Sequence, residues 1–377
     1  MATFVMQSLG CDVAAINTVH FSNHTGYRQV KGTKSTAQEI SALYAGLKQS
    51  YLTDFDVLLS GYAPSAAAVE AVGEIALDLR RKSNAKPGSF FWVLDPVMGD
   101  QGRIYVNEDV VPAYKKIIPH ADLILPNQFE AELLSGIKIT SLSNLADAIT
   151  ALHRTYNVPH IIVTSVQLPS TTSSASSTVT AATAATDSSS ASSSSRPDTL
   201  TIIGSTARSD GSPRLFKVEV PRLDCFFSGT GDMFAALTVA RLREAVFAAD
   251  TATDNPSSSS SSTPLRTTPS WQSPDHVRAH DLPLARSTVK VLASMHRVLE
   301  KTMVDRSAEL ARYPPVSEED DKEFAGLSGA ERRAAVEKRA YLRATKAAEI
   351  RLVRNVGLLQ RPEEGDGVEF VAEEWGV

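Results

Sequence analysis

The chain has 377 residues, of which 42% are hydrophobic and 21% charged, so it can bury the core of one large α/β domain or two smaller ones. The net charge of −5 and the lack of a basic stretch interleaved with aromatic residues argue against nucleic acid as a partner. Two distant cysteines, Cys11 and Cys225, exclude a disulfide framework and fit a reducing, intracellular setting. Because long apolar runs are absent, we expect neither a membrane span nor a secretory signal.

Short apolar runs rich in β-branched and aromatic residues alternate with helical patterns, which predicts βαβ units and a mainly parallel sheet. The last two expected strands have no helix between them and are expected to form an antiparallel edge. The expected strands are 12–21, 56–62, 91–97, 122–127, 160–166, 199–205 and 215–220.

Helical patterns fall between several of these strands. Residues 35–50 open with a serine expected to cap the helix, and residues 65–82 end in cations suited to a helix C-terminus. Residues 141–156 repeat apolar side chains at intervals of three and four. The pattern as a whole predicts a sheet flanked by helices.

Two stretches break the pattern. Residues 170–196 are almost wholly Ser, Thr and Ala, and residues 251–272 carry a serine run flanked by Thr and Pro. Both are predicted to be disordered insertions within one domain, 1–316, because the entropy cost of closing a long loop grows slowly with its length. Residues 317–377 are predicted to be a charged, partly helical extension with a loose acidic tail, and no chemistry is assigned to them.

The stretch FFSGTGDMFAAL places Asp232 at the start of an apolar helical pattern, directly after Gly229, Thr230 and Gly231. A helix start behind glycines offers unpaired N–H groups and a positive dipole, which suit a phosphate. An aspartate there makes chemical sense if it accepts a proton from a hydroxyl while the preceding residues hold the phosphoryl group. The structural alternative is that aspartate favours a first helical turn and glycine favours turns.

Polar residues also follow the central predicted strand, at the edge of a parallel sheet where ligands bind. Asp95 and Asp100 in DPVMGD suit Mg²⁺, which needs oxygen ligands and bridges nucleotide phosphates. They also fit as turn residues around Pro96 and Gly99.

The motif PNQFEAELLSG follows the next predicted strand. Asn127 and Glu130 have the spacing of a capping box in which asparagine replaces serine. The same amide and carboxylate are expected to reach the phosphate region, where they could organise Mg²⁺ through water. The two roles are compatible.

FSNHTGY, residues 21–27, combines hydroxyl, amide, imidazole and aromatic groups that suit a small polar heteroaromatic ligand. His24 is either structural or in contact with the substrate. Thr25 and Tyr62 add an alcohol and a ring that could stack on a planar ligand. Thr164 and Ser165 end another predicted strand and could meet phosphate or a monovalent cation.

Together, FSNHTGY, LLSGY, DPVMGD, the run IYVNEDVVPAYKKIIPHADLILPNQFEAELLSG and FSGTGDMFAAL resemble pyridoxal kinase, of the ribokinase-like superfamily, in a fungal type with serine-rich insertions. The resemblance covers roughly residues 3–248 outside the first insertion. PNQFEAELLSG beside GTGD is specific to this family, whereas GTGD alone marks the superfamily. The resemblance implies an α/β, ribokinase-like fold with a mainly parallel central sheet flanked by helices.

The resemblance also implies an activity, the ATP-dependent phosphorylation of the 5′-hydroxyl of pyridoxal, pyridoxine or pyridoxamine in vitamin B6 salvage. Asp232 would be the catalytic base, and Gly229, Thr230 and Gly231 the anion hole. Thr25, Tyr62, Gly231 and Asp232 would bind the vitamin. The residues implied around ATP are Asp95, Tyr105, Asn127, Gln128, Phe129, Glu130, Thr164, Ser165, Leu223, Asp224, Cys225 and Thr230.

The implied cofactors are ATP, Mg²⁺ or another divalent cation such as Zn²⁺, and a monovalent cation, K⁺ or Na⁺. The metal residues would be Asp95, Asp100, Glu130 and Thr164. Leu125 stands where mammalian relatives carry threonine, which would remove a side-chain oxygen from a monovalent-cation site, and the loop after DPVMGD is shorter than theirs. The resemblance further implies a homodimer in the cytoplasm, with the nucleus as a second compartment, and no nucleic-acid or membrane partner.

Two alternatives stay open at this point. One is a hydroxymethylpyrimidine-type kinase of the same superfamily, against which FSNHTGY argues. The other is a non-catalytic protein that binds vitamin or nucleotide, against which the intact GTGD and DPVMGD argue.

The start of the sequence departs from the family pattern. The family begins with an apolar strand and a small-residue loop, whereas MATFVMQSLGCDV resembles the end of the first helix. We therefore expect the first, interior strand to be missing through an N-terminal truncation, which would leave buried backbone groups unpaired. The chain as written is expected to be poorly soluble or weakly active.

Overall fold

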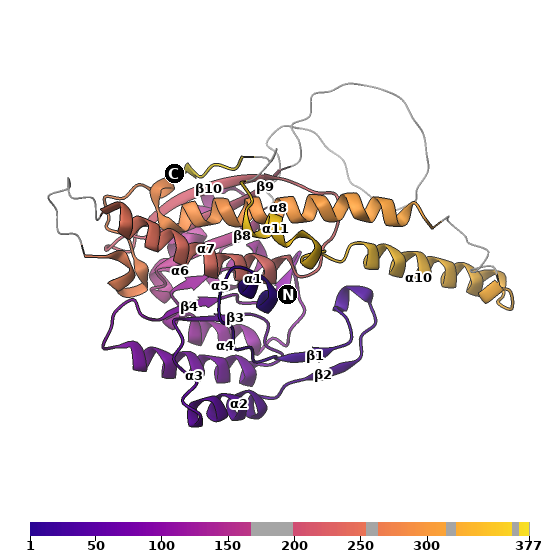
Figure 1. Cartoon of the computed structure of the whole chain (residues 1–377), viewed down its shortest axis with the longest axis horizontal. Helices are drawn as coiled ribbons and strands as arrows, with labels where there is room; N and C mark the ends of the chain where they lie inside the picture. Colours follow the sequence, from indigo (N-terminus) through magenta and orange to yellow (C-terminus); the bar gives the residue numbers. More distant parts are fainter. Residues whose placement is uncertain (167–198, 254–262, 314–321, 364–368, 377) are drawn as a thin grey trace, which may run out of the picture.

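The computed structural model describes residues 1–166, 199–253, 263–313, 322–363 and 369–376. In these residues a seven-stranded sheet lies between two helical layers (Figure 1). The strand order is β11 (Glu373–Glu374), β10 (Pro213–Pro221), β9 (Thr199–Ala207), β8 (His160–Val166), β7 (Leu123–Ile124), β4 (Phe91–Leu94) and β3 (Val57–Ser60).

The predicted strand directions are confirmed. β3, β4, β7 and β8 pair in parallel, and β9 and β10 pair antiparallel to their neighbours. Because β9 is antiparallel to both β8 and β10, β10 runs in the same direction as β3, β4, β7 and β8. The sheet is thus mainly parallel, with the antiparallel edge expected for residues 199–220.

The central strand β4 is buried on both faces, as its unbroken apolar run FWVL requires. Trp92 and Leu94 join one core cluster, and Phe91 and Val93 join the other. The first layer contains α2 (Ala37–Gln49), α3 (Ala66–Ser83), α4 (Val110–Ile117), α5 (Gln128–Ser135) and α6 (Leu142–Tyr156). The second contains α1 (Ala2–Ser8), α7 (Thr230–Thr253), α8 (Pro283–Leu310) and α11 (Val356–Gln360).

Several helices begin at side-chain caps. Ser65 and Ser141 cap α3 and α6 by accepting hydrogen bonds from the third helical N–H. The prediction that Ser35 caps α2 is wrong, because Thr36 caps it in a reciprocal box with Glu39. Thr36 is therefore the residue that sets the start of α2.

The strand predicted over residues 12–21 is only partly formed. Residues 12–17 have no strand structure, and β1 (Val19–Phe21) pairs with β2 (Gly32–Lys34) in a separate two-stranded sheet. A segment with alternating apolar residues forms a strand only where a neighbouring strand can pair with it. In the described residues β3 is the edge of the central sheet, and residues 2–8 form α1.

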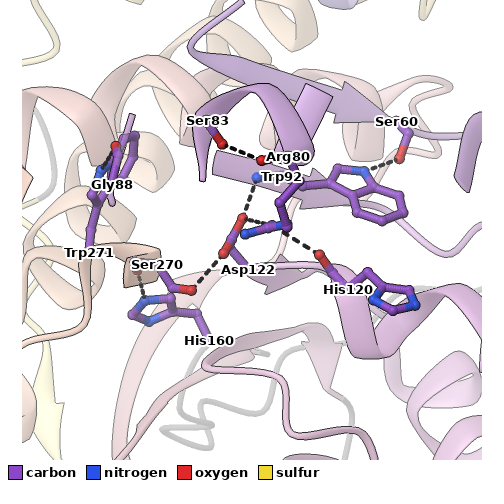
Figure 2. A network of polar contacts seen from close by, with 10 residues as sticks. All are labelled: Ser60, Arg80, Ser83, Gly88, Trp92, His120, Asp122, His160, Ser270 and Trp271. Atoms are coloured by element: carbon purple, nitrogen blue, oxygen red, sulfur yellow. Dashed lines mark hydrogen bonds and ion pairs between the residues drawn. The ribbon is translucent and has the colours of Figure 1, made fainter. Parts of the chain in front are cut away.

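A buried polar network joins the amino ends of the central strands (Figure 2). The Asp122 carboxylate accepts hydrogen bonds from the Arg80 guanidinium at 2.5 Å, the Trp92 N–H at 2.6 Å and the Ser270 hydroxyl at 2.6 Å. The Ser270 carbonyl lies 2.7 Å from Nε2 of the buried His160. The network ties the segment around Ser270 to the sheet.

Trp271 shows that the second predicted insertion is shorter than 251–272. Its side chain is 6% exposed, stacks on Phe91 with ring centroids 4.2 Å apart and donates to the Gly88 carbonyl at 2.8 Å. Residues 263–272 are therefore packed, in η3 (Leu265–Thr267) and η4 (Pro269–Trp271), and η5 (Ala279–Asp281) follows them. Residues 254–262 and the predicted insertion 170–196 lie outside the described residues.

The C-terminal segment contributes to the core. The predicted charged helix is α10 (Gly329–Ala347). After η6 (Val353–Asn355) the chain enters α11, and Leu352, Leu359 and Phe370 join the cluster formed with α7 and α8. β11 pairs with β10, so the tail predicted to be loose is held at residues 373–374. None of the helices in the described ranges combines the length and apolar character needed to cross a lipid bilayer.

Candidate active site

The carboxyl ends of β3, β4, β7 and β8 meet at one edge of the sheet, where open α/β sheets bind ligands. Asp95 follows β4, and its N–H donates to the Ser60 carbonyl of β3 at 2.8 Å. Asn127 follows β7 and forms a parallel bridge with Thr164 of β8. Three predicted site residues thus stand at neighbouring strand ends.

Glu130 locks the first turn of α5 to the loop after β4. Its carboxylate accepts hydrogen bonds from the Met98 N–H at 2.8 Å, the Gly99 N–H at 3.4 Å and the Asn127 N–H at 2.9 Å. The side-chain amide oxygen of Asn127 in turn accepts from the Glu130 N–H at 2.9 Å, which confirms the predicted capping box. Burial raises the pKa of Glu130 to about 7, although these three N–H groups act in the opposite direction.

The DPVMGD motif ends in a two-strand turn, β5 (Gly99–Asp100) and β6 (Arg103–Ile104). Gln101 and Gly102 at its tip both have positive φ, 49° and 76°, as a tight hairpin turn requires. A Cβ on Gly99 would lie 2.3 Å from the Arg103 carbonyl and 2.7 Å from the Phe129 ring, so the turn requires glycine there. Asp100 is exposed on this turn.

Asp95 lies within electrostatic reach of two other carboxylates, Glu130 and Asp232. Asp95 is 9% exposed, and its burial, followed by the negative charges of Glu130 and Asp232, raises the pKa of Asp95 well above its usual range. Desolvation also raises the pKa of Asp232, whose side chain remains accessible to solvent. The structure therefore brings Asp95, Glu130 and Asp232 together from three separate motifs.

The GTGD motif forms the start of α7. Gly229 has φ +85°, and its carbonyl accepts the first helical hydrogen bond, from Met233 N–H at 3.0 Å. By helical geometry the N–H groups of Thr230, Gly231 and Asp232 have no partner inside α7. A Cβ on Gly231 would lie 3.8 Å from Oδ2 of Asp95, so the helix start faces the DPVMGD loop.

Tyrosines surround the carboxylates. Tyr105 is 58% exposed, yet partial desolvation, followed by the charges of Glu130, Asp95 and Asp100, raises the pKa of Tyr105 above its usual range. Tyr114, which is not among the predicted site residues, is buried with its hydroxyl 3.4 Å from the Gly61 carbonyl, beside Tyr62. Its pattern in α4 is that of an ordinary core residue, so no sequence signal marks it.

The loop FSNHTGY lies between β1 and β2. Thr25 opens the 3-10 turn η1 (Thr25–Tyr27), capped by His24, whose Nδ1 accepts from the Gly26 N–H at 3.1 Å. A Cβ on Gly26 would lie 3.8 Å from the ring of Phe226, which is 72% exposed and lies three residues before Gly229 of GTGD. The loop and the stretch before α7 are therefore neighbours.

Two of the remaining predicted nucleotide residues, Gln128 and Phe129, lie in the first turn of α5, and others lie on irregular backbone. β8 is irregular between Val163 and Val166, and Ser165 there has φ 55°. The Cys225 N–H donates to the Leu223 carbonyl at 2.8 Å, which turns the chain just before Phe226. The Gln128 amide donates to the Ile139 carbonyl at 3.1 Å.

The predicted metal residues do not form a closed cluster. Across the described residues, no three His, Cys, Asp or Glu side chains converge closely enough to hold a metal ion by themselves. The donors available, a buried Asp95 and a Glu130 engaged with backbone N–H groups, nevertheless fit Mg²⁺, which commonly takes one or two carboxylates, waters and substrate phosphates.

The sequence matches the family described as phosphomethylpyrimidine kinase over residues 6–206, more than half of the chain. It is 36% identical to pyridoxal kinase of Sus scrofa over 248 residues, covering 63% of this chain and 68% of that one. It is 34% identical to pyridoxal kinase of Homo sapiens, covering 63% of this chain and 70% of that one.

The fold is shared with solved structures. The structure of pyridoxal kinase from Leishmania donovani in complex with ADP and pyridoxamine superimposes with a TM-score of 0.64, at 23% identity, over 99% of this chain and 93% of that one. The sequence relatives and the solved structure with the same fold are all pyridoxal kinases, and DPVMGD, PNQFE and GTGD meet at one sheet edge. The chain belongs to the pyridoxal kinase family, within the ribokinase-like proteins.

Proposed function

We propose that this chain transfers the γ-phosphate of ATP to the 5′-hydroxyl of pyridoxal, pyridoxine and pyridoxamine. The observation that carries the proposal is the position of Asp232, a carboxylate in the first turn of α7 behind Gly229–Gly231, opposite the DPVMGD loop. A carboxylate beside helix N–H groups supports the proposal, because alcohol phosphorylation requires a proton acceptor and donors for the transferred group.

In the proposed reaction, the Asp232 carboxylate accepts the proton of the vitamin hydroxyl as its oxygen attacks the γ-phosphorus. The bond from the γ-phosphorus to the bridging oxygen breaks, and ADP leaves. The raised pKa of Asp232 makes it a stronger base than an exposed aspartate. The N–H groups of Thr230, Gly231 and Asp232 supply donors for the negative charge on the transferred group.

Asp95 and Glu130 would hold Mg²⁺, or another divalent cation such as Zn²⁺, together with the nucleotide phosphates, with Asp100 and Thr164 nearby. When bound, the cation would neutralise charge on the phosphates. Burial of Asp95 beside two other acids supports this assignment, because a desolvated carboxylate group is costly without a positive partner. K⁺ or Na⁺ beside Thr164 and Ser165 is part of the same proposal, without a contribution from Leu125.

The ligand subsites are proposed from the same geometry. Thr25 and Tyr62 would contact the vitamin ring, since the loop that holds Thr25 touches Phe226 just before GTGD. Tyr105 would cover the phosphates, because the negative charges of Glu130 and Asp95 lie close enough to raise the pKa of Tyr105. The remaining nucleotide contacts would come from Asn127, Gln128, Phe129, Ser165, Leu223, Asp224 and Cys225.

An ATP-consumption assay tests the proposal, with pyridoxal, pyridoxine, pyridoxamine and hydroxymethylpyrimidine as acceptors. We expect turnover with the three B6 vitamers and formation of their 5′-phosphates, identified by mass. Preference for hydroxymethylpyrimidine would favour the other superfamily activity, and ATP or vitamin binding without turnover would favour a non-catalytic protein.

We also propose a cytoplasmic location and a homodimer. The two cysteines are free and far apart in the sequence, which agrees with a reducing compartment such as the cytoplasm. A homodimer is proposed from the family resemblance. Localisation of a tagged chain tests the compartment, and light scattering of the purified chain tests the homodimer.

A further inference from the structure

The C-terminal segment contacts the loop that holds Thr25. The Glu349 carboxylate accepts a hydrogen bond from the Tyr27 hydroxyl at 2.9 Å and lies 3.1 Å from Nε2 of His24. The Tyr341 hydroxyl donates to the Gly26 carbonyl. The Arg28 guanidinium lies 4.3 Å from the centre of the Tyr341 ring. Residues on both sides of Thr25 are therefore held from one direction.

The protonation of these groups is set by their partners. A backbone N–H can only donate, so His24 accepts from Gly26 through Nδ1 and carries its proton on Nε2, toward Glu349. Burial and the neighbouring Glu349 raise the pKa of Tyr27 to about 12, so its hydroxyl keeps its proton and donates. One carboxylate thus receives two donors from the loop.

Glu349 itself is fixed by the backbone around it. Ala347 and Ala348, which precede it, are 0% and 9% exposed, and Leu352 is 7% exposed in the core beside α7 and α8. The Arg351 guanidinium bonds to Glu309 of α8 at 2.6 Å. The backbone at Glu349 is therefore anchored, and the Glu349 side chain, 49% exposed, reaches the loop from that anchored position.

The opposite side of the loop faces the catalytic end of α7. Gly26 lies against the Phe226 ring, and Phe226 precedes Gly229 in the GTGD stretch. The loop is thus held between the C-terminal segment and the approach to Asp232. In Figure 1 the tip of the β1–β2 hairpin extends away from the central sheet toward α10.

We propose that Glu349 and Tyr341 are positioning residues, which hold the loop 24–28 so that Thr25 meets the vitamin. This inference rests on the function proposed above. It gives residues 341–349 a part in recognition of the B6 vitamer and none in the binding of ATP.

The test compares Glu349→Ala and Tyr341→Phe with the wild-type chain and with Glu337→Ala, a matched control on the exposed face of α10. Initial rates are measured with pyridoxal varied at saturating ATP, and with ATP varied at saturating pyridoxal. For Glu349→Ala we expect the KM for pyridoxal to rise roughly fivefold to twentyfold, as expected for losing a charge-assisted hydrogen bond. In Glu349→Ala the KM for ATP and kcat should stay close to the wild-type values, because only the binding of pyridoxal is weakened. All three constants of the control variant should match wild type.

A second substitution and a second readout separate positioning from general destabilisation. Glu349→Gln keeps an acceptor oxygen and should raise the KM for pyridoxal less than Glu349→Ala does. Amide hydrogen exchange over residues 22–31 should quicken in Glu349→Ala while the thermal midpoint changes little.

Three results would overturn the inference. One is a KM for pyridoxal that is unchanged in both main variants. Another is a parallel loss of kcat, ATP affinity and thermal stability, which would make the contact merely structural. A wild-type chain that phosphorylates no B6 vitamer would overturn the proposed function and this role with it, whereas an active wild type with unaffected variants would overturn this role alone.

Discussion

At the scale of single residues, the proposed site contains three carboxylates that differ in their exposure to solvent. Asp95, Glu130 and Asp232 come from three motifs, and each has its pKa raised mainly by burial. Glu130 is the most constrained, because all its described hydrogen bonds come from backbone N–H groups. Asp232 is the accessible member, which suits a group that must meet a substrate hydroxyl.

Replacing Asp232 by alanine tests its role as the base. The variant should fold and bind ATP, but kcat should fall about 10²- to 10⁴-fold, the usual contribution of general-base catalysis. Rapid-quench or coupled assays measure kcat, and Asp147→Ala, on the exposed face of α6, serves as the control. Phosphorylation at nearly the wild-type rate by Asp232→Ala would contradict the assignment.

At the scale of elements, α5 and the loop after β4 act as one unit. Both oxygens of Glu130 accept N–H groups, so an amide in its place would turn an NH₂ group toward at least one of these donors. An unsatisfied buried N–H costs about 1–3 kcal/mol. The unit therefore depends on two acceptor oxygens in the Glu130 side chain as well as on the size of that side chain.

Glu130→Gln should accordingly lower the free energy of unfolding by about 1–3 kcal/mol and reduce kcat, because the DPVMGD loop loses its support. Urea unfolding followed by circular dichroism measures the first effect. The comparison is Glu132→Gln, in the middle of α5, whose carboxylate accepts from the Ile139 N–H beyond the end of the helix and from Lys138. If Glu130→Gln were as stable as wild type, the loop would not depend on these hydrogen bonds.

Elements with strong local patterns could be predicted from the sequence, and contacts made across the chain could not. FWVL at 91–94 and the capping box at Asn127 depend on neighbours a few residues away, so their pattern is visible. Trp271 sits in a polar stretch, and its burial depends on Phe91, far away in the sequence. The partner of Tyr27, Glu349, is 322 residues distant, so nothing local indicates it.

The same limit explains the wrong strand at 12–17. Those residues have a strand-like composition, but a strand forms only where another strand offers a ladder of hydrogen bonds. The carboxylate cluster was predictable in its members, since each lies in a recognisable motif. The position of the loop at Thr25 beside the start of α7 could be seen only in the structure, where Gly26 lies next to the Phe226 ring.

At the scale of the whole molecule, buried histidines link stability to pH. Burial lowers the pKa of both His153 and His160 to about 4, because desolvation disfavours the charged imidazole. In the unfolded chain both titrate near the usual value of about 6.5. Between these two values the unfolded state binds more protons, so their contribution to stability is complete above pH 6.5 and is lost as the pH falls toward 4.

His160→Gln isolates one of these contributions, since the glutamine amide can still donate toward the Ser270 carbonyl. The difference in unfolding free energy between wild type and variant should change by about 1.4 kcal/mol per pH unit between pH 6.5 and 4, with wild type losing more. Urea titrations at four pH values measure it. A difference independent of pH would mean that His160 titrates normally in the folded protein.

Ligand binding should also stabilise the whole fold, because the proposed site joins residues from β4, α5 and α7. With Mg²⁺ and ATP at about 100 times their dissociation constant, the gain is about 2.7 kcal/mol. Scanning calorimetry measures the midpoint with ATP alone, with Mg²⁺ and ATP, and after chelation by EDTA. We expect EDTA to abolish turnover and to remove most of the gain, and an unchanged rate in EDTA would rule out the proposed metal role.

The core contribution of Leu352, Leu359 and Phe370 has a consequence for synthesis on the ribosome. These residues cover α7 and α8, yet 60 residues of chain separate Leu310, the end of α8, from Phe370 (370 minus 310). At about 5–20 residues per second, that interval lasts roughly 3–12 s. During it, the growing chain carries every strand described for the sheet except β11, together with an uncovered apolar helix face. Chaperone binding or aggregation competes with folding in this period.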